Sequence, residues 1–147
     1  MSAVLRTASA ADYDQVVRLL RAAGLPTAGL QPTLPDFLVA EENGQVVGAV
    51  GLEVYGDSAL LRSAVVDTGR RGSGVGSELV AELLAHAGRR GVREIYLLTT
   101  TAEDYFPRFG FTRVRREAVA PALYASEEFT GACPDSAVAM RKVLDRS

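Results

Sequence analysis

The sequence predicts a single mixed α/β domain, and three observations carry that prediction. The chain has 147 residues, the usual size of one domain. Its composition, 48% hydrophobic and 23% charged, is that of a globular protein. The spacing of its apolar residues changes along the chain, from the alternation of strands to the helical period and back. We therefore expect residues 1–147 to form one domain, in which helices flank a mixed, largely antiparallel sheet.

The first half of the chain predicts a strand, a helix and an antiparallel meander. A short strand is expected over residues 4–6, and a helix follows that starts after Ser9 and stops at Gly24. Residues 26–35 hold three prolines and predict a surface loop. Three further strands, joined by tight turns, are expected at 37–41, 45–55 and 59–66.

The second half combines two helices and a helical turn with three strands. Apolar residues between Val75 and Ala87 recur at helical spacing, and residues 94–99 form a nearly continuous apolar run typical of a buried strand. The remaining expected elements are a short helix at 102–109, a helical turn at 121–126 and strands at 111–114 and 137–143.

Composition excludes several classes of function. The formal net charge of −2 gives no positive field for nucleic acid. The single Cys133 and single His86 exclude a disulfide framework and a cysteine- or histidine-rich metal site. No apolar run approaches the ~20 residues that cross a bilayer, and the N-terminus lacks the pattern of a signal peptide. We expect a cytoplasmic protein without a metal, nucleic-acid or membrane partner.

A glycine-rich turn between the strand 59–66 and the following helix is the most informative segment. It reads Gly69-Arg70-Arg71-Gly72-Ser73-Gly74-Val75-Gly76. Glycines let backbone amides converge, and a helix N-terminus adds unpaired N–H groups and partial positive charge. The turn therefore predicts a diphosphate site. Its spacing differs from that of a dinucleotide fingerprint, and it lacks the Gly-Lys-Ser/Thr of a P-loop.

The spacing Arg71-x-x-Gly74-x-Gly76 resembles the [Arg/Gln]-x-x-Gly-x-[Gly/Ala] signature of the GNAT superfamily of acetyl-CoA-dependent N-acetyltransferases. Residues 106–111 are similar to that family's Tyr-x-x-Leu-Gly-Phe segment. The resemblance implies a GNAT-like sheet that splays between its fourth and fifth strands. It also implies acetyl-CoA as co-substrate, with the acetyl group between Val65 and Leu98.

The same resemblance implies which residues bind acetyl-CoA. Backbone amides from Arg71 to Gly76 would hold the pyrophosphate, and Ser77 lies nearby in the first helical turn. The main chain of Val65 and Val66 would pair with pantetheine as an added strand. The expected set is Val65, Val66, Arg71, Gly72, Ser73, Gly74, Val75, Gly76 and Ser77.

A narrower likeness concerns the acceptor. The run from Leu97 to Glu103 and the tail from Cys133 to Lys142 resemble the arsenic-resistance N-acetyltransferases and the acetyltransferase domain of N-acetylglutamate synthases. This implies an enzyme that acetylates the amine of a small amino acid or analogue by direct attack on the thioester, with a role in arsenical resistance. Two alternatives stay open: a non-catalytic acetyl-CoA-binding regulatory domain and a protein N-terminal acetyltransferase.

Two sets of residues are candidates for the chemistry. Phe106 occupies the position of the family's tyrosine, so the neighbouring Tyr105 is a candidate acid for the thiolate, or a packing residue. Glu53 and Arg62 are expected on one sheet face, where the carboxylate attracts or deprotonates an amine and the guanidinium binds a carboxylate. Ser63 is assigned to substrate binding with Arg62. The alternative is a structural cross-strand ion pair.

Several polar residues receive no role from the sequence. They are Cys133, Arg113, Arg115 and Arg116. His86 is expected to face solvent on its helix. The terminal strand 137–143 is expected to offer an edge through which a homodimer could form.

Overall fold

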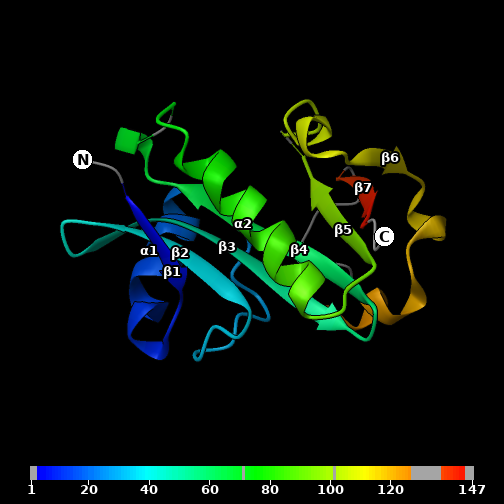
Figure 1. Ribbon diagram of the computed structural model, residues 1–147, viewed down its shortest axis with the longest axis horizontal. Helices are drawn as coiled ribbons and strands as arrows, with labels where there is room; N and C mark the ends of the chain where they lie inside the picture. Colours follow the sequence, from blue (N-terminus) through cyan, green and yellow to red (C-terminus); the bar gives the residue numbers. More distant parts are fainter. Residues whose placement is uncertain (1–2, 71, 101, 127–136, 145–147) are drawn as a thin grey trace.

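A computed structural model describes residues 3–70, 72–100, 102–126 and 137–144. Its strands form one seven-stranded sheet in the order β1-β2-β3-β4-β5-β7-β6 (Figure 1). The strands are β1 (Val4–Thr7), β2 (Phe37–Glu42), β3 (Gln45–Tyr55), β4 (Ser58–Val66), β5 (Glu94–Thr99), β6 (Thr112–Val114) and β7 (Val138–Val143). Among the described strand pairs, β4 and β5 run parallel and the other five pairs are antiparallel. The predicted mixed α/β sheet is confirmed.

Two α-helices cover opposite faces of this sheet. Helix α1 (Tyr13–Ala22) packs Val16 and Leu20 against one face, and α2 (Val75–Arg89) crosses the other face (Figure 1). Gly48 in β3 lets α2 approach closely, because a Cβ there would lie 2.9 Å from the Leu79 side chain. Helix α2, whose N-terminus follows the glycine-rich turn, is therefore seated directly on the central strands.

The central strands β4 and β5 separate after a short paired stretch. Their register runs only from Ser58–Leu60 against Glu94–Tyr96. Beyond these residues the two strands diverge, as Figure 1 shows. The divergence leaves facing backbone edges open to a ligand, and it confirms the predicted splay.

The segment expected as a third helix is shorter than the sequence suggested. Residues 102–105 form a turn, and a 3₁₀ helix covers Phe106–Phe109 before Gly110 adopts φ 93°. Pro107 lies at the second position of this element, where its fixed φ is tolerated but a longer helix is not favoured. The expected helical turn near 121–126 is likewise a 3₁₀ helix, Pro121–Ala125.

The terminal strand does not supply the expected edge. Strand β7 lies between β5 and β6 and pairs with both, so its backbone groups are used inside the sheet. In the described part of the chain, the edges are β1 and β6. The predicted homodimer therefore loses the strand on which it was based.

Two other expectations about exposure were wrong. The loop before β2 is not purely superficial, because its Leu30 and Leu34 side chains are buried beside α1. The side chain of His86 does not simply face solvent: its Nε2 atom lies 2.8 Å from Asp36 Oδ1, and 22% of the side chain is exposed. Among the described helices, none has the length and apolar character needed to cross a bilayer.

Candidate functional site

A cavity of about 850 Å³ occupies the opening between β4 and β5. Its wall includes most of the residues that the sequence assigned to a site: Arg62, Ser63, Val65, Val66, Gly72, Gly74, Gly76, Ser77 and Tyr105. Ser73 and Val75 belong to the same glycine-rich turn, and Arg71 lies outside the described residues. Leu98, expected beside the acetyl group, also lines the cavity together with Val65.

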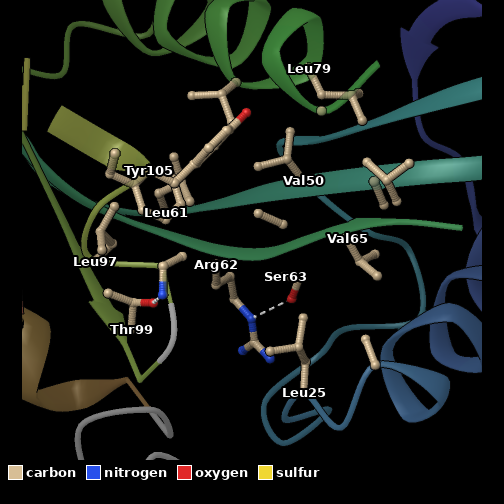
Figure 2. Close-up of a pocket in the computed structure, with 18 of the residues that line it drawn as sticks. Leu25, Val50, Leu61, Arg62, Ser63, Val65, Leu79, Leu97, Thr99 and Tyr105 are labelled. Carbon is tan, nitrogen blue, oxygen red and sulfur yellow. Dashed lines mark hydrogen bonds between the residues drawn. The ribbon is translucent and has the colours of Figure 1, made fainter. Parts of the chain in front are cut away.

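The cavity passes from one face of the sheet to the other. Leu61 packs in the cluster under α2, whereas the next residue, Arg62, points to the opposite face, and both line the cavity. Figure 2 shows Leu79 and Tyr105 on the α2 side and Arg62 beside Leu25 on the other. A ligand in the opening can therefore be approached from the second face by another molecule.

The turn at the start of α2 has the geometry of an anion site. Gly74 caps the helix with φ 90°, and Gly72 has φ 83°, a backbone region that side chains disfavour. The first amides of α2 thus point out of the helix end, where the helix dipole adds partial positive charge. Arg70 of the same turn forms an ion pair with Glu42 of β2.

A bulge shapes the β4 wall of the cavity. Val65 pairs with Ala49 and Arg62 with Gly51, so two residues of β4 face one residue of β3. Ser63 in this bulge has φ 60°, which is rare for a residue with a side chain. The bulge is what turns the backbone of β4 toward the opening beside β5.

Tyr105 carries a hydroxyl group into the cavity from the segment after β5. The hydroxyl lies 3.0 Å from Ser77 Oγ in the first turn of α2, and the Arg108 guanidinium lies 4.3 Å from the centre of its ring. Phe106 is 6% exposed and packs edge-to-face on Phe111. Phe106 therefore packs in the core, whereas the adjacent Tyr105 places a hydroxyl group in the cavity.

Glu53 and Arg62 meet as their strand positions predicted. Glu53 pairs with Leu60 and Arg62 with Gly51, which puts the two side chains diagonally on one face. Arg62 Nη1 donates to Glu53 Oε2 at 2.7 Å, and Tyr55 donates its hydroxyl to Glu53 Oε1 at 2.6 Å. Whether this pair can bind substrate depends on which cavities its two side chains line.

The ion pair extends from the main cavity to a smaller one. Arg62 lines the 850 Å³ cavity, whereas Glu53 and Tyr55 line a neighbouring cavity of about 350 Å³. Because Arg62 lies between the carboxylate and the main cavity, an amine held beside β4 would meet the guanidinium first. Glu53 is therefore poorly placed to accept a proton from it directly.

Burial and hydrogen bonding act in opposite directions on Glu53. Burial alone would raise the pKa of its carboxyl group, but hydrogen bonds from Tyr55, Arg62 and Ser126 outweigh burial and leave that pKa below its ordinary value of 4.5. The same burial, with the neighbouring carboxylate, raises the pKa of Tyr55 to about 12. At neutral pH Glu53 is therefore a carboxylate, and it faces the guanidinium of Arg62.

We expect the contribution of the Glu53–Arg62 ion pair to the free energy of unfolding to depend on pH. A carboxylate with a lowered folded-state pKa stabilises the protein above pH 4.5, and that contribution is lost as the pH falls through the lowered pKa. Urea titrations of wild type and Glu53→Gln should therefore differ by about 2 kcal/mol near neutrality and converge in acid. A difference that stays constant from pH 7 to pH 3 would contradict the coupling.

Sequence reasoning missed the wall formed by the end of α1 and the loop after it. Ala23, Gly24, Leu25 and Pro26 line the cavity on the Arg62 side. The sequence shows them only as a helix stop, because Gly24 and Pro26 have an ordinary role in ending a helix. Their contact with β4 depends on tertiary packing.

Comparison with known proteins agrees with this geometry. The model of the acetyltransferase (GNAT) domain matches residues 34–113, more than half of the chain. An uncharacterised N-acetyltransferase of Chlorobaculum tepidum is 34% identical over 83 residues, which are 56% of this chain and 53% of that protein. An amino-acid acetyltransferase of Aeromonas salmonicida is 30% identical over 84 residues, 56% of this chain and 19% of that protein. The chain thus spans about half or less of these relatives' length.

Solved structures share the fold over nearly the whole chain. Rv2747 from Mycobacterium tuberculosis, in complex with CoA and NLQ, has a TM-score of 0.81 and 25% identity, covering 97% of this chain and 99% of its own. N-acetylglutamate synthase from Neisseria gonorrhoeae, complexed with coenzyme A and N-acetyl-glutamate, has a TM-score of 0.83 and 18% identity, covering 99% of this chain and 36% of its own. With its family match, splayed sheet and glycine-rich turn, the chain belongs to the GNAT acetyltransferase family.

Proposed function

We propose that residues 1–147 form an acetyl-CoA-dependent N-acetyltransferase. The observation that carries the proposal is one continuous cavity that joins the start of α2 to the opening between β4 and β5. A long cofactor with an anionic end and a reactive end needs both features together. The coenzyme A in the solved relatives from M. tuberculosis and N. gonorrhoeae supports the same cofactor for this chain.

The cofactor is proposed to lie along β4. Its diphosphate would accept hydrogen bonds from the amides of the turn through Gly76, with Ser77 beside it, where the helix dipole favours an anion. Its pantetheine amides would pair with the main chain of Val65 and Val66, since that edge of β4 is not matched by β5. The thioester would then lie near the Ser63 bulge and Leu98.

The acceptor is proposed to be the amine of a small amino acid or amino-acid analogue, including arsenic-containing analogues. The amino-acid acetyltransferase of A. salmonicida and the N-acetyl-glutamate bound to the N. gonorrhoeae enzyme support this class. The acceptor would enter on the side of Leu25 and Arg62, opposite α2.

The transfer is proposed to be direct. The neutral amine nitrogen attacks the thioester carbonyl carbon, the carbon–sulfur bond breaks, and the thiolate leaves with the bonding electrons. The attacking nitrogen releases one proton to water, and the thiolate gains one proton from an acid of the protein, which regains it from water. Tyr105 is proposed as the acid that supplies the thiolate proton, for which its hydroxyl would have to leave Ser77, beside the proposed diphosphate, and turn along the cavity toward the thioester.

The experiment that tests the proposal is a turnover assay with acetyl-CoA and a panel of acceptors. Free amino acids, an arsenic-containing amino-acid analogue and N-terminal peptides are compared by thiol release, and products are identified by mass spectrometry. We expect acetylation of free amino acids or the analogue to exceed that of peptides. Acetyl-CoA binding without thiol release on any amine would instead indicate a regulatory domain, and preference for peptides would indicate a protein N-terminal acetyltransferase.

We expect Tyr105→Phe to lower kcat about tenfold with little change in acetyl-CoA affinity. The effect is modest because a thiolate, the conjugate base of a thiol with a pKa of about 8.5, is a good leaving group even before it gains its proton. Ser77→Ala is the matched control, since it removes the same hydrogen bond and keeps the phenol. Equal losses of acetyl-CoA affinity in both variants, with kcat unchanged, would make Tyr105 a cofactor contact instead of an acid.

A further inference from the structure

We propose that Arg62 is a positioning residue that fixes the acceptor loop, residues 23–28, against the Ser63 bulge, and is not itself a ligand of the acceptor. The inference deepens the proposed function and rests on it for its kinetic test. It replaces the view that this guanidinium binds an acceptor carboxylate. The contacts of the side chain carry it.

Arg62 is buried, and its N–H donors are engaged with protein groups. The residue is 3% exposed. Nη1 donates to Glu53 Oε2 at 2.7 Å and to the carbonyl oxygen of Ala28 at 2.8 Å, and Nη2 donates to the carbonyl oxygen of Pro26 at 3.3 Å. Nε donates to Ser63 Oγ at 3.0 Å, the bond drawn in Figure 2. A guanidinium has five N–H donors, and these contacts use four of them.

Charge compensation argues in the same direction. Glu53 neutralises the guanidinium, and the Tyr55 hydroxyl holds the carboxylate at 2.6 Å so that it faces Arg62. To bind an acceptor carboxylate in the bidentate way, Arg62 would have to give up these bonds inside a buried environment. A buried donor that loses its partner is costly, so the existing contacts are favoured.

The acceptor loop depends on this side chain for its backbone. Pro26 and Ala28 lie in irregular chain, where carbonyl groups have no helix or sheet partner of their own. Arg62 reaches both carbonyls from a central strand. Since Ala23 to Pro26 form the cavity wall, the guanidinium sets where that wall stands relative to β4.

The bulge is the second element that Arg62 holds. Ser63 has φ 60°, a conformation that persists only where the surroundings enforce it. The bond from Arg62 Nε to Ser63 Oγ is one such constraint. One side chain therefore links the wall on the acceptor side to the strand segment beside the proposed thioester.

The test uses Arg62→Lys, which keeps the charge but cannot span four acceptors. Each amino acid that wild type acetylates is paired with its α-carboxamide, and kcat/KM is measured for both. We expect kcat/KM to fall roughly tenfold for both members of each pair, so that their ratio stays that of wild type, with acetyl-CoA affinity unchanged. A loss confined to the carboxylate acceptor would overturn the proposal.

A second readout does not depend on turnover. Hydrogen exchange followed by mass spectrometry should show faster exchange in residues 23–28 of Arg62→Lys, and unchanged protection there would overturn the proposal. Arg6→Lys is the control, because Arg6 likewise makes several hydrogen bonds, to the carboxylates of Asp12 and Glu41, but lies on β1 away from the cavity. It should lower stability without changing the acceptor loop. If wild type acetylates no amine, the proposed function fails, and hydrogen exchange alone decides the role of Arg62.

Discussion

Placing a negative charge at the start of α2 should nearly abolish acetyl-CoA binding. Ser73 is exposed in the turn before the helix cap Gly74, so Ser73→Glu puts a carboxylate beside the proposed diphosphate. A charge about 7 Å from two phosphate charges repels them by roughly 4 kcal/mol at a protein surface. That is about 10³-fold in affinity, to be measured by isothermal titration calorimetry.

The control for this variant is Ser73→Gln, which has the same shape without the charge. Both substitutions remove the bond from Ser73 Oγ to the carbonyl of Arg70, so that bond cancels from the comparison. The fold should survive, since an acidic residue near a helix N-terminus stabilises the helix. Equal acetyl-CoA affinity in the two folded variants would place the diphosphate elsewhere.

The second large effect is expected in the stability of the sheet. A Cβ atom at Gly51 would lie 2.2–2.4 Å from ring atoms of Phe37, a buried residue on the neighbouring strand. Gly51→Ala should therefore lower the free energy of unfolding by about 3 kcal/mol, and Tm by roughly 10 °C. Thermal and urea unfolding measure the loss.

Two further variants show whether the ring is the cause. Gly51→Ala made in a Phe37→Leu background should cost under about 1 kcal/mol, because the clash is gone. Gly88→Ala should instead stabilise by about 0.5–1 kcal/mol, since Gly88 is exposed in α2 with nothing within 4 Å of the added atom. A full loss of stability in the Phe37→Leu background would contradict the assigned packing.

Local sequence pattern accounts for most of the fold and for part of the site. The tight turn between β3 and β4 fixes their register from Tyr55 and Ser58 onward, which is why the diagonal pair of Glu53 and Arg62 could be predicted. The glycine-rich turn was predictable because Gly72 and Gly74 adopt positive φ, a backbone conformation that glycine allows and other residues disfavour. These features are encoded by residues close together in the chain.

The features that the sequence did not reveal involve distant segments. The carbonyls of Pro26 and Ala28 meet Arg62 across more than thirty residues, and a carbonyl carries no signal in the sequence. The interior position of β7 is set by pairing with β5 and β6, not by its own composition. Cys133 lies outside the described residues, and its role stays unassigned.

The central claim is that acetyl-CoA occupies the opening between β4 and β5, with its diphosphate at the start of α2. Titration of isotope-labelled protein with acetyl-CoA, followed by backbone amide NMR, tests it most directly. We expect saturable shifts in residues 72–77 of the turn and 63–66 of β4, with those of the distant edge strand β1 unchanged. Shifts confined to other parts of the chain, or an unchanged spectrum at millimolar acetyl-CoA, would contradict the account.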